Sequence, residues 1–345
     1  MREFLNALKR PAALLLAVLF ITACGKSAPE QKVLAITGLT MGTSYNVKWV
    51  STDPDTTTLQ QAVTAELVDI NNSMSTYIDS SELSKLNRHT VGEWFPVSDQ
   101  LIEVLSLSRQ VSDQSSGQFD ATVGPLVNLW GFGPDGRIEK APSESQIQQL
   151  RPRIGYQLLD IDTENKRVRR TADIYIDLSA IAKGYGVDII AELLEQRGIK
   201  NYLVEIGGEM RLQGNKPEQT PWRVAIERPD VTGRSVQGVV LPGNNAVATS
   251  GDYRNYFEQD GIRFSHTIDP GTGKPITHKL ASVTVITPSC ALADAYATAL
   301  TVMGDEAGYK FAVQQGIEAY FIVKAEEGFK IRMTPGFSKF LDSQE

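Results

Sequence analysis

Pairs of short strands separated by tight turns are the feature of this sequence that most restricts its fold. In each pair, two runs of β-forming residues flank a turn that contains Gly, Asn or Asp. The pairs are Tyr156–Asp162 with Arg167–Thr171, Asn201–Ile206 with Glu209–Gly214, Tyr256–Gln259 with Ile262–Ile268, and Glu318–Val323 with Phe329–Met333. Strands joined by so short a connection pair antiparallel, so the sequence predicts antiparallel sheets.

Helical patterns lie between these pairs and are grouped rather than alternating with single strands. Apolar residues recur at helical spacing from Leu59 to Met74 and again after Ser98, and Ser143–Gln146 forms a capping box. A longer helix is expected from near Ser179 to Gly198. This grouping predicts an α+β fold, with mostly antiparallel sheets built from hairpins and flanked by helices, and not a doubly wound parallel sheet.

The charge of the chain argues against nucleic acid as a ligand. The formal net charge is -7 over 345 residues, and the sequence contains no long basic block. No glycine-rich dinucleotide fingerprint or P-loop opens a helix.

The first residues predict export. Arg2, Lys9 and Arg10 precede an apolar run, Pro11–Ala23, which is shorter than the roughly 20 residues that span a bilayer. We therefore expect a signal peptide at 1–23, with an uncleaved helical anchor as the alternative. The run ends in "ITAC", which resembles the lipobox of bacterial lipoproteins and implies acylation of Cys24. Residues 24–32 are then a tether, and 33–345 form the folded domain.

Cysteine use fits this expectation. Apart from Cys24 the chain contains only Cys290, so no disulfide is expected once Cys24 carries lipid. Cys290 is interpreted as a small buried residue at the start of a helix, with a reactive thiol as the alternative. Three histidines without a Cys/His cluster argue against a zinc site.

Asp177–Asp188 combines a strand end with a helix start. Ser179 is a candidate cap, Gly184 and Gly186 allow another group to approach the backbone closely, and Lys183 lies in the first turns. A helix N-terminus with a lysine suits phosphate, whereas the structural alternative is a capped helix packed on a sheet.

The stretch "DAYATAL" places a carboxylate and a hydroxyl on one helix face. Asp294 and Thr298 are four residues apart, with alanines between them. The pair is either a buried polar contact or part of a site for a hard cation such as Mg²⁺, which prefers oxygen ligands.

Two further segments are candidates for a site. Ser265–Ile276 carries His266 on a strand just before a Pro/Gly turn, where the histidine is either catalytic or structural. Gly117–Gly133 is apolar and aromatic, and it either lines a slot for a flat ring or belongs to the core.

These segments occur together in one order. The motifs are "MGTSYNV", "FDATVGPLVNLWGFG", "DLSAIAKGYGVD", "YLVEIGGEM", "TSGDYRNYF", "SHTIDPGTGKPI" and "ADAYAT". Together they resemble the ApbE family of FAD:protein FMN transferases, from about Leu39 to Phe340. The resemblance implies that FAD is split at its pyrophosphate, that FMN is joined through its phosphate to a Thr or Ser hydroxyl of a target flavoprotein, and that AMP leaves.

The resemblance also implies roles for individual residues. Mg²⁺ would be held by Asp294, Thr298 and the backbone carbonyl of Ala180. The implied FAD-binding residues are Met41, Tyr77, Phe119, Asp120, Ala121, Lys183 and Ile268. Of two candidate bases for the target hydroxyl, His266 is favoured over Asp294, because a metal-bound carboxylate is a poor base and an unperturbed histidine titrates near pH 6.5.

Partners and location follow from the same resemblance. Family targets are subunits of membrane-bound redox complexes, so we expect a periplasm-facing protein with a lipid anchor, in the inner membrane rather than the outer. The alternative functions are an FAD-binding protein without chemistry and an FAD pyrophosphatase that releases FMN and AMP.

Overall fold

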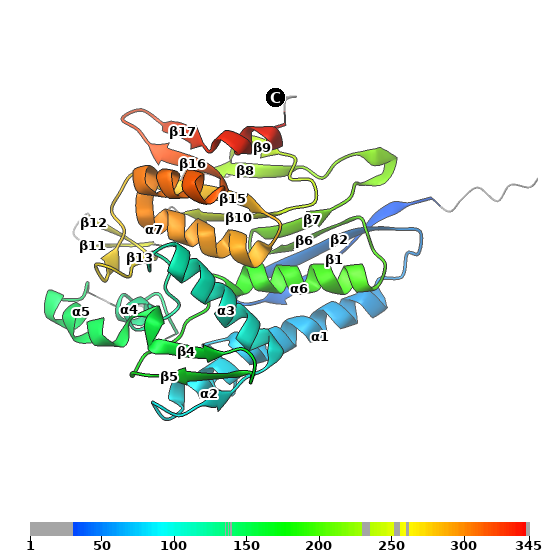
Figure 1. Ribbon diagram of the computed structural model, residues 1–345. Helices are drawn as coiled ribbons and strands as arrows, with labels where there is room; N and C mark the ends of the chain where they lie inside the picture. Colours follow the sequence, from blue (N-terminus) through cyan, green and yellow to red (C-terminus); the bar gives the residue numbers. More distant parts are fainter. Residues whose placement is uncertain are drawn as a thin grey trace, which may run out of the picture. The chain divides into compact units, whose positions relative to one another are not determined.

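An eight-stranded antiparallel sheet organises the fold (Figure 1). Its strands follow the order β1 (Lys32–Thr40), β2 (Thr43–Ser51), β6 (Tyr202–Ile206), β7 (Glu209–Gln213), β10 (Ala246–Gly251), β15 (Leu280–Thr287), β16 (Glu318–Lys324) and β17 (Phe329–Met333). The computed structural model describes residues 30–342 except 135, 137, 139, 230–234, 252–255, 260 and 261. Residues 31–345 form one compact unit.

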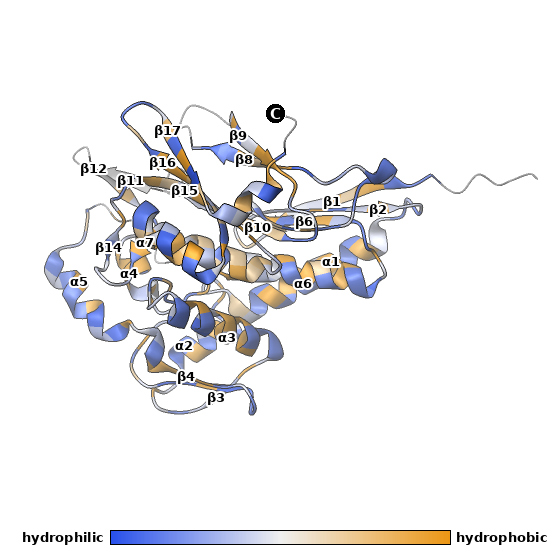
Figure 2. Cartoon of the chain, turned by 45° about the horizontal axis from the view of Figure 1, so that its top comes forward, coloured by the Kyte–Doolittle hydropathy of each residue, from blue (hydrophilic) through white to orange (hydrophobic). Residues whose placement is uncertain are grey.

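Two helices cover one face of this sheet and meet each other. They are α6 (Ala182–Gln196) and α7 (Cys290–Gln315), while α1 (Thr57–Met74) packs against α6 and α3 (Asp99–Gln114) packs against α7. The principal core lies here, between the alanine-rich start of α7 and apolar residues of β10, β15 and α3. Bands of hydrophobic and hydrophilic residues alternate along α1 and α3, as expected for helices with one buried face (Figure 2).

The opposite face of the sheet is covered by a separate apolar cluster. Residues of β8 (Val224–Arg228), β9 (Ser235–Val240) and η4 (Pro335–Phe340) pack there against Val247, Ile286 and Ile322. The remaining helices are α2 (Glu82–Arg88), α4 (Gly124–Leu129), α5 (Glu144–Leu150), η1 (Arg151–Arg153), η2 (Tyr156–Leu158) and η3 (Pro217–Gln219). The remaining strands are β3 (Phe95–Pro96), β4 (Leu159–Asp162), β5 (Arg167–Arg170), β11 (Tyr256–Gln259), β12 (Ile262–Ser265), β13 (Ile268–Asp269) and β14 (Lys274–Pro275).

The structure confirms the α+β prediction and the four predicted hairpins. These are β4–β5, β6–β7, β11–β12 and β16–β17, each paired antiparallel. The turn at Asp260 and Gly261 lies outside the described residues. The β1–β2 hairpin was not predicted; it pairs over nine residues on each strand.

Two local predictions have opposite outcomes. The capping box at Ser143 is present, and the Gln146 side-chain oxygen accepts a hydrogen bond from the Ser143 backbone N–H. The assignment of Ser179 as a helix cap was wrong, because α6 begins only at Ala182 and its N-cap is Ile181. Instead, the Ser179 N–H donates to the Asp177 carboxylate at 2.8 Å.

The predicted export segment is not tested. Cys24, the predicted signal peptide (1–23) and most of the tether (24–32) lie outside the described residues, so these assignments stay predictions. Within the described residues, no helix has both the length and the apolar character that a membrane span requires.

Close contact between α6 and α7 depends on Gly184. A Cβ at this position would stand 2.3 Å from the Cys290 carbonyl oxygen and 2.9 Å from Ala291 Cα. Both neighbours are backbone atoms, so they cannot rotate away. The sequence-based expectation that Gly184 permits a close approach is confirmed, and the approaching group is the first turn of α7.

We therefore expect Gly184→Ala to destabilise the protein. Separating the two helices to admit a methyl group costs about 1–3 kcal/mol, as for other overpacked cores. The measurement is the free energy of unfolding in urea. Gly238→Ala in β9 is the matched control, because a Cβ there meets no heavy atom within 4 Å. Equal unfolding free energies for the two variants would contradict this account of the contact.

Candidate active site

A pocket of about 600 Å³ lies where the β1–β2 turn, the end of α1 and the start of α6 come together. It brings together three of the residues expected to bind FAD, namely Met41, Tyr77 and Lys183. Asp177 and Ser179, from the segment before α6, also line it. Residues that are distant in the sequence thus share one cavity.

The turn that carries Met41 has an unusual backbone. Met41 and Gly42 both have positive φ, at 49° and 71°, which is the two-residue turn that fits the twist of a β-hairpin. Methionine rarely adopts this conformation, and the cost is on the order of 1–2 kcal/mol. The side chain packs over Gly186, where a Cβ would stand 3.1 Å from the Met41 methyl group. Gly186 therefore provides the close approach predicted for it.

Three charged side chains meet beside this pocket. The Lys183 ammonium lies 3.0 Å from Glu209 Oε1 and 3.6 Å from Asp294 Oδ2. Burial lowers the pKa of Lys183, but the Asp294 and Glu209 carboxylates outweigh that effect and raise it overall. Asp294 also accepts the Gly184 N–H at 3.2 Å, so the start of α6 directs both a cation and a backbone donor at this carboxylate.

Glu209 is the site residue that the sequence analysis missed. It is the first residue of β7, just after the Gly207–Gly208 turn, and only 5% of its surface is exposed. Burial raises its pKa to about 7, and the nearby Asp294 acts in the same direction, while Lys183 opposes them. Its buried Oε2 atom has no hydrogen-bond partner among the described residues. The available sequence signal was a carboxylate directly after a glycine turn in one of the quoted motifs.

The oxygen atoms around Asp294 suit a hard cation. Asp294 is 5% exposed, and Thr298 lies one helical turn further on in α7 and is half-buried. The unpartnered Glu209 Oε2 adds a second carboxylate oxygen in need of a positive partner. Metal sites built from three or more His, Cys, Asp or Glu side chains do not occur in the described part of the chain.

The position of Asp294 depends on Asp188. This buried α6 carboxylate accepts the N–H groups of Cys290 and Ala291, both at 3.0 Å, and the Ser289 hydroxyl at 2.8 Å. Arg211 of β7 pairs with it at 3.0 Å. Asp188 therefore fixes the N-terminus of α7, one turn before Asp294. Cys290 is fully buried there, which confirms its interpretation as a small core residue at a helix start.

Comparison with known proteins identifies the family. A family model described as "ApbE family" matches residues 41–321 of this chain. The chain belongs to the ApbE family.

Individual ApbE relatives agree over nearly the whole length. A Vibrio cholerae protein named "FAD:protein FMN transferase" is 46% identical, covering 95% of this chain and 97% of the relative. The solved "Flavin Transferase ApbE from Vibrio cholerae" superimposes with a TM-score of 0.84 at 45% identity, over 90% of this chain and all of that one. The apo form of Pseudomonas stutzeri flavinyl transferase ApbE gives 0.83 at 42% identity, over 90% and 96% of the two chains.

The ApbE segment that contains Phe119, Asp120 and Ala121 adjoins the pocket rather than lining it. Phe119 and Ala121 belong to the principal core, and the Ala121 carbonyl accepts the Asp177 N–H at 2.7 Å. Asp120 accepts hydrogen bonds from the Thr122 N–H and hydroxyl and from the Tyr156 N–H, and its burial raises its pKa. These contacts connect the loop to the strand end that precedes α6.

The remaining residues implied by the ApbE resemblance lie outside this pocket. Ala180 is half-buried against the principal core, two residues before α6. Ile268 packs with Leu126, Trp130 and Ile147 in a small separate cluster. His266, between β12 and β13, is half-buried, and its ring meets Phe132 edge-on with centroids 6.3 Å apart. None of the three lines the pocket that Met41 and Lys183 share.

Proposed function

We infer that this chain is an FAD:protein FMN transferase, the activity in the names of its relatives. The family match supports this, and so does one feature of the site: the buried Asp294 carboxylate, with Lys183 and the Gly184 N–H directed at it, beside a pocket formed by Met41 and Tyr77. A fixed set of charged and oxygen-bearing groups at a helix start suits the pyrophosphate of a dinucleotide.

The reaction that we propose is a phosphoryl transfer to protein. The oxygen of a Thr or Ser hydroxyl of the target forms a bond to the phosphorus on the riboflavin side of FAD. The bond from that phosphorus to the bridging oxygen breaks, and AMP leaves with the bridging oxygen. The hydroxyl proton passes to a base on the enzyme, and the product is a phosphoester between FMN and the target.

We propose that Asp294, Thr298 and the Ala180 carbonyl hold Mg²⁺. A bound Mg²⁺ would offset the negative charge that develops on the phosphates. The chain itself contributes the Lys183 ammonium, which remains protonated at neutral pH because two carboxylates raise its pKa. Glu209 and Asp294 orient that ammonium toward the pocket that Lys183 lines.

The aromatic ring of Tyr77 supports a flavin or adenine ligand. It is 69% exposed although it lies on the pocket, so a flat ring could stack on it. Met41, which also lines the pocket, provides a second apolar surface.

Replacing Asp294 tests the metal assignment. We expect Asp294→Ala to lower the rate of FMN transfer at least about a hundredfold, because the Mg²⁺ that would offset the phosphate charge loses a ligand. FAD binding, measured by quenching of flavin fluorescence, should persist. Asp305→Ala on the same helix is the control and should match the wild type. Magnesium titrations add an independent readout, since Asp294→Ala should no longer bind the ion. Unchanged transfer by Asp294→Ala would refute the assignment.

Replacing His266 tests the proposed base. If His266 takes the proton of the target hydroxyl, His266→Gln should lower kcat about 10²–10⁴-fold while FAD affinity is retained. The rate–pH profile should also lose its limb near the titration of histidine. If the limb persists in His266→Gln, another group, with Asp294 as the first candidate, acts as the base.

We also propose that the mature protein is lipid-anchored through Cys24 and faces the periplasm, on the inner membrane. The support is the short apolar run before Cys24 and the "ITAC" sequence. Subunits of membrane redox complexes are the proposed targets. Cys24→Ala should move the protein from the membrane fraction to the soluble fraction of fractionated cells. An unmodified Cys24 in the membrane-extracted wild-type protein, by mass spectrometry, would contradict the proposed anchor.

A further inference from the structure

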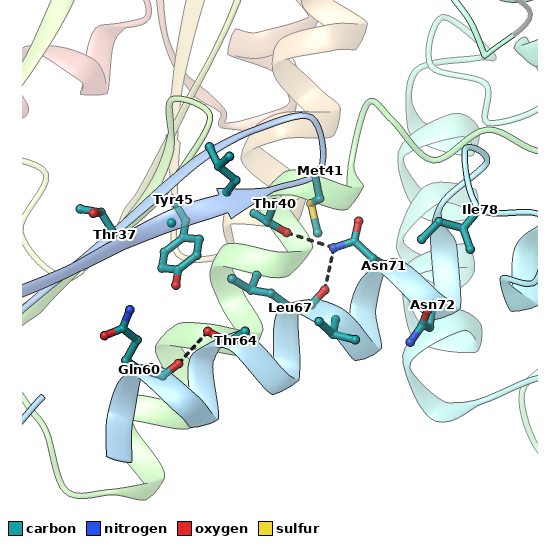
Figure 3. Close-up of a pocket in the computed structure, with 13 residues that line it drawn as sticks. Thr37, Thr40, Met41, Tyr45, Gln60, Thr64, Leu67, Asn71, Asn72 and Ile78 are labelled. Carbon is teal, nitrogen blue, oxygen red and sulfur yellow. Dashed lines mark hydrogen bonds between the residues drawn. The ribbon is translucent and has the colours of Figure 1, made fainter. Parts of the chain in front are cut away.

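A groove lies along β1, which is an edge strand of the large sheet as far as the chain is described, next to the candidate active site (Figure 3). Four consecutive β1 residues, Thr37–Thr40, line one side, and α1 lines the other. Tyr45 of the neighbouring strand β2 also lines the groove, and β1 is the edge strand of the sheet. The groove shares Met41, Asn71 and Ile78 with the pocket of the candidate site.

The backbone of β1 is available for pairing along this groove. Thr40 and Thr43 flank a two-residue turn and form a hydrogen-bonded pair. In an antiparallel pair, hydrogen-bonded and non-hydrogen-bonded residues alternate, so Thr40 and Gly38 bond to β2 whereas Leu39 and Thr37 do not. The Ser44 carbonyl accepts the Gly207 N–H, which confirms that Ser44, the partner of Leu39, faces β6. The N–H and C=O groups of Thr37 and Leu39 therefore point outward, at the open edge.

After Lys32 at its start, β1 lacks the features that usually prevent strand addition. Residues Val33–Thr40 contain no charge and no proline, and their register with β2 runs without a bulge. The opposite edge strand, β17, carries Lys330 and Arg332. An exposed edge of this kind can accept an extended peptide as an added strand.

Exposed apolar side chains lie on both sides of the groove. Leu39 is 87% exposed and Val68 of α1 is 52% exposed. Thr40 faces α1, because its hydroxyl accepts a hydrogen bond from Asn71 at 3.0 Å, so the adjacent Leu39 faces the other side of the sheet. A strand added at this edge would therefore have Leu39 near its face turned away from α1 and Val68 near its face turned toward α1.

We propose that this groove binds the acceptor segment of the target flavoprotein as an extended strand paired with Thr37–Leu39. The inference rests on the proposed transferase function, which requires a protein hydroxyl to reach the site. Two residues of a strand span about 7 Å, so a segment that follows β1 past Thr40 enters the region lined by Met41, Asn71 and Ile78. Its next residues then present the hydroxyl to the candidate active site.

Steady-state kinetics test the groove. The substrate is a purified acceptor flavoprotein that the wild-type protein is able to label with FMN. We expect Val68→Asp and Leu39→Pro to raise the KM for the acceptor about tenfold or more, while FAD affinity stays unchanged. The first change puts a charge on the apolar wall, and the second removes an outward N–H. Val313→Asp is the control for Val68→Asp, because Val313 is an exposed helical valine outside the groove. Val33→Pro is the control for Leu39→Pro, because the Val33 backbone also faces outward but lies beyond the groove. Acceptor KM values within twofold of wild type for Val68→Asp and Leu39→Pro would overturn the proposal.

Cross-linking gives a readout independent of activity. A photoreactive probe is attached to Leu39→Cys or, as control, to Val313→Cys; Cys290 is fully buried and should not react. The binding partner is the same acceptor with its labelled hydroxyl residue replaced by valine or alanine. We expect Leu39→Cys alone to cross-link within a few residues of that position. Cross-links to a second copy of this chain or to its own tether would overturn the proposal. If the chain lacked transferase activity, the wild-type protein would not label the acceptor with FMN. If only the groove proposal were wrong, the wild-type protein would still label the acceptor, but Leu39→Cys would not cross-link to it.

Discussion

The contact between the starts of α6 and α7 is the constraint on which the site depends. Gly184 allows the first turn of α7 to lie against α6, and Asp188 binds the free N–H groups of that turn. These two interactions place Lys183 and the Gly184 N–H opposite Asp294, although the residues are more than a hundred positions apart. The cluster is therefore held by two helices and not by a mobile loop, which is the arrangement that precise positioning requires.

The electrostatics of this cluster favour a cation. Removing two carboxylates from water is costly, and the raised pKa of Glu209 reflects that cost. Lys183 supplies one positive charge to Glu209 and Asp294 together, and Glu209 Oε2 has no hydrogen-bond partner in the part of the chain that the structure describes. A single ammonium neutralises only part of the negative charge of two buried carboxylates. A divalent cation would therefore be stabilised there more than at a neutral site. The proposed role of Asp294 and Thr298 agrees with this imbalance.

Local patterns could be predicted from the sequence, and tertiary contacts could not. Turn residues identified four hairpins, and the spacing of Asp294 and Thr298 placed them on one helical face. The contact of Glu209 with Lys183 depends on how β7 lies beside α6, which no local pattern encodes. The Asp188 cap joins residues about a hundred positions apart and was missed for the same reason. Ser179 resembled a cap, but its N–H is bound by Asp177 and the helix begins later.

The β1–β2 hairpin connects the candidate site to the open sheet edge. Its tip is held at two points, by the Thr40–Asn71 hydrogen bond and by Met41 packed over Gly186. Met41 at that tip has a positive φ, which costs conformational free energy, and the two contacts hold it in this conformation. One rigid element thus forms a wall of the pocket and the edge on which an acceptor strand would pair. In phosphoryl transfer the protein acts mainly by positioning, so an acceptor bound to this hairpin would approach the phosphate in a direction set by the fold itself.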